Sequence, residues 1–411
     1  MLYGLTFGGI AFILLFVLAG CSYGHKQYDP CASNGRPASD GLLVLEVTDY
    51  GRFWDRTAND RLYKFLENET AGRNVVLVTF IHGWHHNAEL SDDNRRDFQK
   101  TVRELQEKVN TREYADSRVA LQLQEKVEVI GLYIGWRGQS LPSFLDYLTF
   151  WGRKAAAERV GSGDLREFLL KLNKLYQKRN YHSPNTFMGM VTIGHSFGGQ
   201  VALRTVAELL ENDLIDDGAH SDGVEGLGDL TVLINPAVEA HQYERIHRIA
   251  KTDVKFPAEQ SPVMLTVSAD NDWARSYWFP VGRWVSRLFR ASMPTEEETK
   301  EWTQALGVYE PQHTHRFTVT RQTHAINEDS CSQMDFSKLP AVDRVVMQNI
   351  PGRSNANHPF IVASTESTEL LDGHNGIFNE TFRSFLAEYV ALSQGKRICV
   401  RRAAMTPPSK Q

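Results

Sequence analysis

Short, nearly unbroken runs of aliphatic and β-branched residues recur along this chain, and longer stretches between them repeat apolar residues every three to four positions. The short runs are typical of strands buried on both faces, and the longer stretches are typical of amphipathic helices. Their alternation predicts β–α–β units, so we expect an α/β fold with a mostly parallel central sheet flanked by helices. The predicted strands are residues 42–47, 74–81, 126–134, 188–193, 230–234, 262–267 and 358–363.

Helical spacing is found in four further segments, at residues 61–66, 97–109, 200–210 and 381–392. Two long insertions, at about residues 137–186 and 273–358, separate strands that α/β units normally join by short connections. The first insertion carries apolar residues at helical spacing between residues 141 and 176. We expect two or more helices there, which either pack on the sheet or form a lid with an apolar underside.

The second insertion begins with aromatic residues interleaved with arginines, at residues 273–290. This pattern predicts an amphipathic helix, which lies either on the core or at a membrane surface. Further along the same insertion, residues 331–353 are expected to form an irregular connection.

The first twenty residues carry no charged side chain, and residues 9–18 form an apolar run. The run ends in Leu18-Ala19-Gly20-Cys21, which resembles the lipobox of bacterial lipoproteins, in which the cysteine is acylated and becomes the first mature residue. The resemblance implies a signal peptide at residues 1–20 and a membrane-anchored lipoprotein of the bacterial cell envelope, facing the periplasm or the exterior. The alternative is an uncleaved transmembrane anchor.

The composition of the 411 residues, with 42% hydrophobic and 23% charged side chains, is that of a globular protein with one large core. We expect residues 42–399 to form this domain, residues 21–41 to form a flexible tether, and residues 400–411 to form a disordered tail. The formal net charge of −5 does not indicate a polyanion-binding surface, so nucleic acid is not an expected partner. The oligomeric state is left open.

Three cysteines remain besides Cys21: Cys31, Cys331 and Cys399. In an oxidising compartment they predict one disulfide and one free thiol, without indicating which two residues pair. No two of them have C-x-x-C spacing, so a zinc site built on them is not expected.

The predicted strand at residues 188–193 leads into Gly194-His195-Ser196-Phe197-Gly198, a G-x-S-x-G pattern, and then into a predicted helix. A strand, a tight turn and a helix in this order are the context of a nucleophile elbow. Glycines are needed there because side chains two residues on either side of the serine would collide with the neighbouring strand and helix. Ser196 is therefore the candidate nucleophile.

Three further features complete a pattern. His82-Gly83 follows a central strand, Asp270 and Asp272 follow another, and His374 lies in a Gly/Asn/Asp loop between the last strand and the final helix. Together with the G-x-S-x-G turn, they resemble the α/β-hydrolase superfamily over residues 42–392, with Ser, Asp and His in the superfamily's chain order. The sequence motifs around His82 and Trp136 resemble those of a poorly characterised bacterial branch of this superfamily. Membership of that branch does not indicate a substrate.

The resemblance implies a serine esterase with Ser196 as nucleophile, His374 as base and Asp272 as the acid that orients it. Asp270 is the alternative acid. The backbone N–H groups of Trp84 and Phe197 are expected to form the oxyanion hole. This chemistry requires no metal and no cofactor. Both insertions are expected to lie near the active site.

The expected substrates are carboxylic esters with lipid-like or medium-length acyl chains, because the predicted anchor and the apolar insertions favour them. A peptidase, amidase or thioesterase on the same triad is one alternative, and a catalytically idle envelope protein that only binds is another. A metal site at His82, His85 and His86 is also conceivable from composition. Their spacing matches no helix-based zinc pair, however, so we expect a polar, hydrogen-bonded loop.

Overall fold

The computed structural model describes residues 27–29, 35–111, 126–138, 150–182, 186–215, 223–251, 256–257, 260–272, 295–324, 341–355 and 357–405. The predictions for Cys21, Cys31, Cys331 and residues 273–290 fall outside these residues, and those for the disulfide and the anchor stay predictions. Among the described residues, no helix combines the length and the apolar character needed to cross a membrane.

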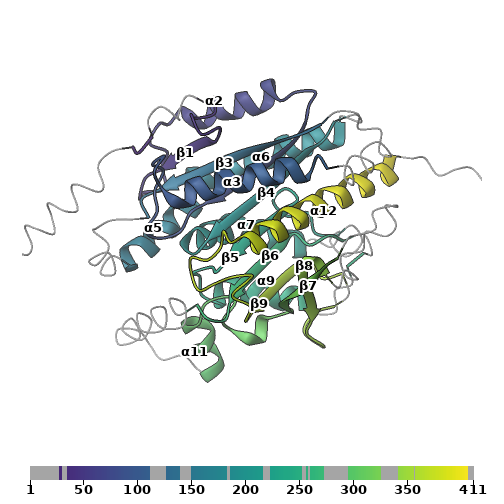
Figure 1. The fold of residues 1–411 in the computed structure, drawn as a ribbon. Coiled ribbons are helices and arrows are strands. Elements are labelled where there is room, and N and C mark those ends of the chain that lie inside the picture. Colours follow the sequence, from purple (N-terminus) through teal and green to yellow (C-terminus); the bar gives the residue numbers. More distant parts are fainter. Residues whose placement is uncertain are drawn as a thin grey trace, which may run out of the picture.

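The described strands form one sheet of nine (Figure 1). They are β1 (Leu43–Val47), β2 (Asn74–Ile81), β3 (Val127–Trp136), β4 (Met188–His195), β5 (Leu230–Ile234), β6 (Met264–Ala269), β7 (His315–His324), β8 (Ala341–Asn349) and β9 (Phe360–Thr365). Their order across the sheet is β1-β3-β2-β4-β5-β6-β9-β7-β8. Every neighbouring pair is parallel except β7 and β8, so the predicted α/β class with a mostly parallel sheet is confirmed.

Helices connect most of these strands. They are α2 (Ala58–Lys64) with the π-helical turn η2 (Phe65–Glu69), α3 (Asp93–Lys108), α5 (Phe150–Ser162), α6 (Asp164–His182), α7 (Phe197–Ile215), α9 (His241–Lys251), α11 (Glu296–Thr303), the 3-10 turn η5 (Glu310–Gln312) and α12 (Glu380–Met405). Helix α3 begins four residues before its predicted start, because the Asp92 side chain accepts hydrogen bonds from the N–H groups of Asn94 and Arg95 and caps the helix.

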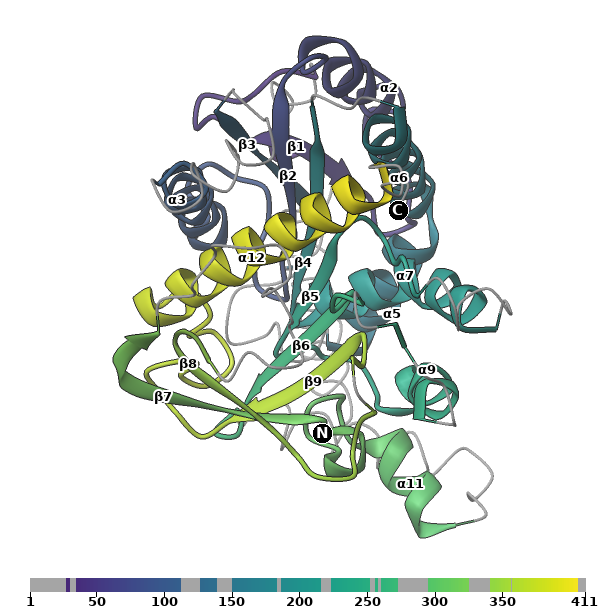
Figure 2. The same cartoon turned by 90° about the vertical axis from the view of Figure 1, so that its right-hand side faces the viewer.

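The sheet is covered on both faces (Figure 2). Helices α3 and α12 lie on one face, and α2, α5, α6, α7 and α9 lie on the other. Successive residues of β2 alternate between the two cores: Leu77 packs under α5 and α7, whereas Val78 packs under α3 and α12. All eight residues of β2 are buried, which explains why its sequence is mostly apolar and does not alternate between apolar and polar residues.

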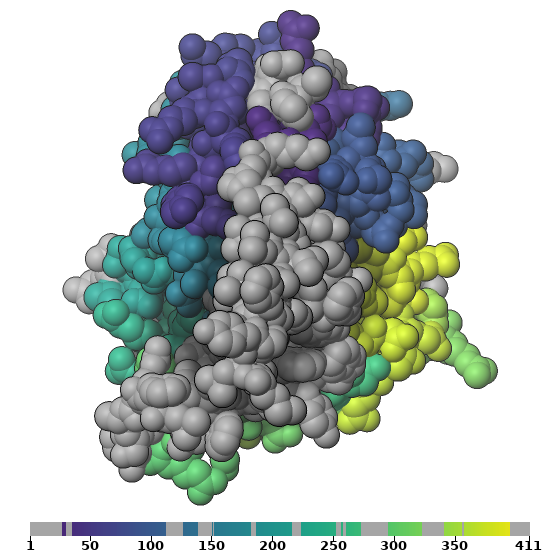
Figure 3. Space-filling model, turned by 90° about the vertical axis from the view of Figure 1, so that its left-hand side faces the viewer, coloured from purple at the N-terminus to yellow at the C-terminus, as the bar shows by residue number. Residues whose placement is uncertain are grey.

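Helices α3 and α12 lie side by side although they are far apart in sequence. Lys108 pairs with Glu388 at 2.5 Å, and Arg383 pairs with Glu104 at 3.0 Å. In the view of Figure 3, the blue surface around α3 borders the yellow surface of the C-terminal part of the chain. Helix α12 continues to Met405, so the predicted helix end at residue 392 and the predicted disordered tail from residue 400 are wrong for this stretch. Residues after Leu392 are mostly good helix formers, which permits the extension.

The first insertion supplies α5 and α6, as predicted. Their apolar residues are buried in the core between these helices, α7 and the sheet; they include Leu165, Phe168, Leu169, Leu172 and Leu175. In the described part of the insertion, packing on the sheet is therefore correct, and the lid with an apolar underside is wrong.

The second insertion was predicted to be helical, but it also contains the strands β7 and β8. Residues 341–349 form an antiparallel edge strand where an irregular connection was expected. The register between the two strands shifts between Val319 and His324, and Asp343 has a left-handed backbone with φ of 52°. This irregularity interrupts the two-residue alternation by which an edge strand is identified in a sequence.

Candidate active site

Four predicted site segments meet at the carboxyl edge of the sheet. Gly83 follows β2, Ser196 follows β4, Asp272 follows β6 and His374 follows β9, and all four strands are parallel. Strands β2 and β4 are neighbours, yet the helices that follow them, α3 and α7, cover opposite faces of the sheet. Ligands of open α/β sheets bind outside the strand ends at such a switch point.

Ser196 occupies a strained turn between β4 and α7. Its φ is 56°, in the left-handed region that residues other than glycine seldom adopt. Two hydrogen bonds fix this geometry: the N–H of Ser196 donates to Ile234 O at 3.1 Å, and the N–H of Ala237 donates to Ser196 O at 2.9 Å. Strain of this kind persists only where the surrounding structure imposes it, and it concentrates at functional sites.

Gly194 and Gly198 make the turn sterically possible. A Cβ atom on Gly194 would overlap the carbonyl oxygen of Gly198, and one on Gly198 would overlap the carbonyl oxygen of Ile81. Both obstacles are backbone atoms, which cannot rotate away as a flexible side chain would. The predicted reason for glycines on both sides of Ser196 is confirmed.

The structure brings the three residues of the predicted triad together. His374 Nε2 lies 2.7 Å from Ser196 Oγ, and His374 Nδ1 lies 2.7 Å from Asp272 Oδ2. The Asp272 side chain is fully buried, whereas 17% of the His374 side chain is exposed. With its proton on Nδ1, the ring donates to the carboxylate and leaves Nε2 to accept from the serine hydroxyl.

Asp270, the alternative acid, is directed elsewhere. Its side chain is on the surface, and Asp270 Oδ2 lies 3.2 Å from Arg316 Nη1. Arg316 also pairs with Glu366 at 3.0 Å. The geometry therefore selects Asp272 as the carboxylate that meets His374.

Two residues that the sequence did not indicate hold the His374 loop in place. Asn235 Nδ2 donates to the carbonyl oxygens of Gly373 and His374 at 3.0 Å each, while Asn235 Oδ1 accepts from the N–H of Ala269 at 2.9 Å. His195 Nε2 donates to the same His374 oxygen at 2.9 Å. Asn235 adopts a left-handed backbone with φ of 44°. Its position before a proline at the end of a predicted strand is the sequence signal that could have drawn attention to it.

Burial of His195 has an electrostatic consequence for the site. Burial, reinforced by the positive charge of neighbouring His374, lowers the pKa of His195 well below its usual value. His195 is therefore neutral at neutral pH and does not oppose a positive charge on His374. The Asp272 carboxylate, 2.7 Å from His374 Nδ1, contacts the other side of the same ring.

The loop after β2 passes directly beside Ser196. A Cβ atom on Gly83 would lie 2.8 Å from Ser196 Cβ. His82 Nδ1 donates to Gly83 O at 2.8 Å, and His82 Nε2 accepts from the N–H of Trp136 at 3.0 Å. The first of these bonds holds the Gly83 carbonyl toward the His82 ring. Because a trans peptide unit is planar, the N–H of Trp84 then points to the opposite side, away from His82.

His82 does not have a nitrogen to spare for a metal ion. Burial lowers its pKa to about 4, so the ring is neutral, and both nitrogens are already hydrogen bonded. His86 Nδ1 lies 3.2 Å from Asp92 Oδ2, as expected of a polar, hydrogen-bonded loop. Within the described ranges, no group of three or more His, Cys, Asp or Glu side chains could hold a metal ion.

Aromatic rings gather on one side of Ser196. The ring of Phe150, from α5, lies 5.3 Å from that of Trp84 and 5.1 Å from that of Phe197, measured between centroids. Trp84 and Phe197 are themselves 6.3 Å apart. Phe197 is buried, whereas Trp84 and Phe150 are only partly buried, so the exposed apolar area of this cluster belongs to Trp84 and Phe150.

No protein-family model matches the chain, and no curated protein sequence matches it. A serine hydroxyl that is hydrogen bonded to an imidazole, which is hydrogen bonded in turn to a buried carboxylate, is an arrangement suited to nucleophilic attack assisted by a general base.

Proposed function

We propose that this protein is a serine hydrolase of the α/β-hydrolase superfamily that cleaves carboxylic esters through an acyl-enzyme intermediate. The observation that carries the proposal is the hydrogen-bonded series from Ser196 through His374 to Asp272. The left-handed backbone of Ser196 at a strand-to-helix turn supports it as well, because this turn characterises a nucleophile elbow.

The reaction proceeds in two steps. Ser196 Oγ attacks the ester carbonyl while His374 Nε2 takes the hydroxyl proton, and the tetrahedral intermediate collapses as His374 returns that proton to the departing alcohol. Water, deprotonated by His374, then attacks the acyl group, and His374 returns that proton to Ser196 Oγ as the carboxylic acid leaves. Asp272 stabilises the charged ring in both steps.

The oxyanion of each intermediate is bound by backbone N–H groups. Phe197 is the first residue of α7, and a helix N-terminus favours negative charge. Trp84 follows Gly83, the residue that lies against Ser196. Donors in such positions stabilise the transition state more than the substrate, and this difference accelerates the reaction.

The proposal is tested by the turnover of p-nitrophenyl butyrate by the purified chain and by covalent labelling with a fluorophosphonate. We expect both, with turnover falling in proportion to labelling as the reagent is titrated. A folded protein that does neither would support the alternative of a binding protein. Matched amide, thioester and ester substrates then separate a peptidase, amidase or thioesterase from an esterase.

We expect the enzyme to prefer medium-length acyl chains over acetate. The partly exposed rings of Trp84 and Phe150, which pack on the buried ring of Phe197 next to Ser196, support this preference. Each buried methylene contributes about 0.8 kcal/mol, so kcat/KM should rise roughly fourfold per methylene until the pocket is full. An acetate-to-decanoate series of p-nitrophenyl esters measures this slope.

Phe150→Ala should flatten that slope, because it removes part of the aromatic surface. Tyr181→Ala is the matched control and should leave the slope unchanged. Tyr181 lies near the C-terminal end of α6, the next helix, and is 62% exposed. A kcat/KM that falls steadily from acetate onward would contradict the preference.

We further propose that the protein is a lipoprotein of the bacterial cell envelope, anchored to a membrane through acylated Cys21. The apolar run at residues 9–18 and the Leu18-Ala19-Gly20-Cys21 sequence support this location. Cys21→Ser should abolish lipid attachment and cleavage before residue 21. Intact-mass analysis of the unmodified sequence decides the matter, because a mature N-terminus at any other residue is incompatible with the proposal.

A further inference from the structure

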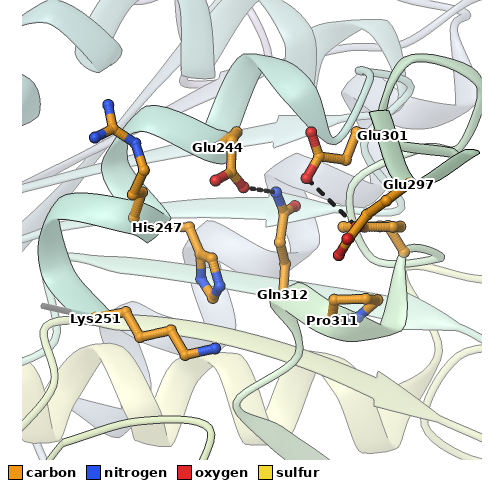
Figure 4. Close-up of a pocket in the computed structure, with 9 residues that line it drawn as sticks. Glu244, His247, Lys251, Glu297, Glu301, Pro311 and Gln312 are labelled. Carbon is orange, nitrogen blue, oxygen red and sulfur yellow. Dashed lines mark hydrogen bonds between the residues drawn. The ribbon is translucent and has the colours of Figure 1, made fainter. Parts of the chain in front are cut away.

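A cavity of about 310 Å³ lies between α9, α11 and the short turn η5, apart from the predicted triad (Figure 4). Helix α9 follows β5 and runs back from the carboxyl edge, so its C-terminal half, with His247 and Lys251, lies away from that edge. His247 is close to His358, which precedes β9, whereas His374 follows β9. A strand of six residues spans about 20 Å, which separates this end of the cavity from Ser196.

Charged residues line the cavity in two groups. Glu244, on α9, faces Glu297 and Glu301, which are one turn apart on α11. Further along the same face of α9, Arg248 and Lys251 supply positive charge. The cavity therefore has an acidic end and a basic end, both formed partly by one helix.

These inward-facing charges differ from their outward-facing neighbours. On the outer faces of the same helices, Arg245 pairs with Glu211 and Lys300 pairs with Glu296, both at 3.0 Å. In the part of the chain that the structure describes, the charged side chains that line the cavity form no ion pair. The three glutamates accept hydrogen bonds from the uncharged side chains of Tyr309 and Gln312, so their negative charge is not neutralised by any described cation.

Two buried polar atoms at the cavity also have no hydrogen-bond partner among the described residues. They are Nδ1 of His247, whose residue is 7% exposed, and Oε1 of Gln312, whose residue is fully buried. Figure 4 shows the His247 ring between the Lys251 ammonium group and Gln312. Buried polar groups nearly always have a partner, so these two atoms indicate that a ligand completes the site.

The electrostatics of the two ends agree with this division. Burial and the neighbouring carboxylates, Glu244 foremost, raise the pKa of Glu301, so a cation would be stabilised there. Burial, followed by the charges of Lys251 and Arg353, lowers the pKa of His247 to about 4, so an anion would be stabilised at this end.

We propose that this cavity binds a small zwitterion, with its ammonium group among Glu244, Glu297 and Glu301 and its phosphate or carboxylate group at His247 and Lys251. Residues 244 and 251 are seven positions apart, which corresponds to roughly 10 Å along a helix axis. A molecule whose charges are separated by several bonds, such as phosphoethanolamine, therefore fits better than an α-amino acid. The site does not depend on the proposed hydrolase activity.

Isothermal titration calorimetry of the full chain with phosphoethanolamine tests the proposal. We expect one site, with an affinity at least about tenfold higher than that for ethanolamine or inorganic phosphate alone, because each of these meets only one end. 5-Aminopentanoate reports whether a carboxylate replaces the phosphate. Glycerophosphoethanolamine distinguishes the two sources of such a ligand. It should bind at least as tightly as phosphoethanolamine if the site takes a lipid headgroup, and less tightly if the site takes free phosphoethanolamine.

Glu301→Gln and Lys251→Met should each weaken phosphoethanolamine binding by about tenfold or more. Their matched controls are Glu296→Gln and Arg245→Met, on the outer faces of the same helices, which should leave the affinity unchanged. Ser196→Ala should also bind normally, which separates this site from the hydrolase proposal. The proposal is overturned if no zwitterion binds the folded chain, or if phosphate alone binds equally well and Glu301→Gln has no effect.

Discussion

Ser196→Ala is expected to abolish covalent labelling by a fluorophosphonate and to lower kcat/KM for esters by roughly 10⁴- to 10⁶-fold. The loss should be this large because the hydroxyl is the atom that forms the acyl-enzyme, and neither His374 nor the oxyanion donors can replace it. Labelling is read by intact mass, and the rate is read with a p-nitrophenyl ester. The fold should survive, since Ser196 is held by its backbone hydrogen bonds and not by its side chain.

Ser196→Gly is the matched control for folding. Glycine adopts a φ of 56° without steric cost, so this variant should unfold at a temperature no lower than the unmodified protein while it is equally inactive. Persistent labelling of either folded variant would remove Ser196 from its proposed role.

Asp272→Asn is expected to lower kcat by roughly 10⁴-fold, whereas Asp270→Asn should change it by less than about threefold. Asparagine at position 272 would present an amide N–H to His374 Nδ1 and favour the tautomer with the proton on Nε2. That nitrogen could then no longer accept the proton of Ser196. Asp270 pairs with Arg316 at the surface, where an exposed ion pair contributes little.

The same two variants compared by pH profile strengthen the test. Asp272→Asn should change the pH dependence of kcat/KM, because it removes the carboxylate to which the His374 ring is hydrogen bonded. Asp270→Asn should keep the profile of the unmodified enzyme. A larger loss in Asp270→Asn than in Asp272→Asn would show that the acid was assigned to the wrong residue.

The parts of the fold that could be predicted are those with local patterns. Strand β2 was predicted with its bounds because all its residues are buried and most of them are apolar, and the turn at Ser196 was predicted because its glycines satisfy a local steric requirement. The two nearby carboxylates Asp270 and Asp272 could be ranked from sequence. Their separation into a surface position and a buried one appears only in the structure.

Features that depend on distant residues could not be predicted. Asn235 and His195 support the His374 loop from other strands, and no local pattern indicates that contact. Helical spacing in α6 did not reveal whether residues such as Phe168 form a lid or fill the core, because both require an apolar stripe. Strand β8 was missed because an irregular register breaks its alternation.

The position of β9 links the completion of the sheet to the order of synthesis. Although β9 is the last strand in the sequence, it lies between β6 and β7, which are made earlier. A nascent chain therefore keeps two open strand edges until β9 enters between them, and open edges invite pairing with other chains. The loop that carries His374 follows β9 directly, so a chain that has not yet closed its sheet has not yet assembled Ser196, His374 and Asp272.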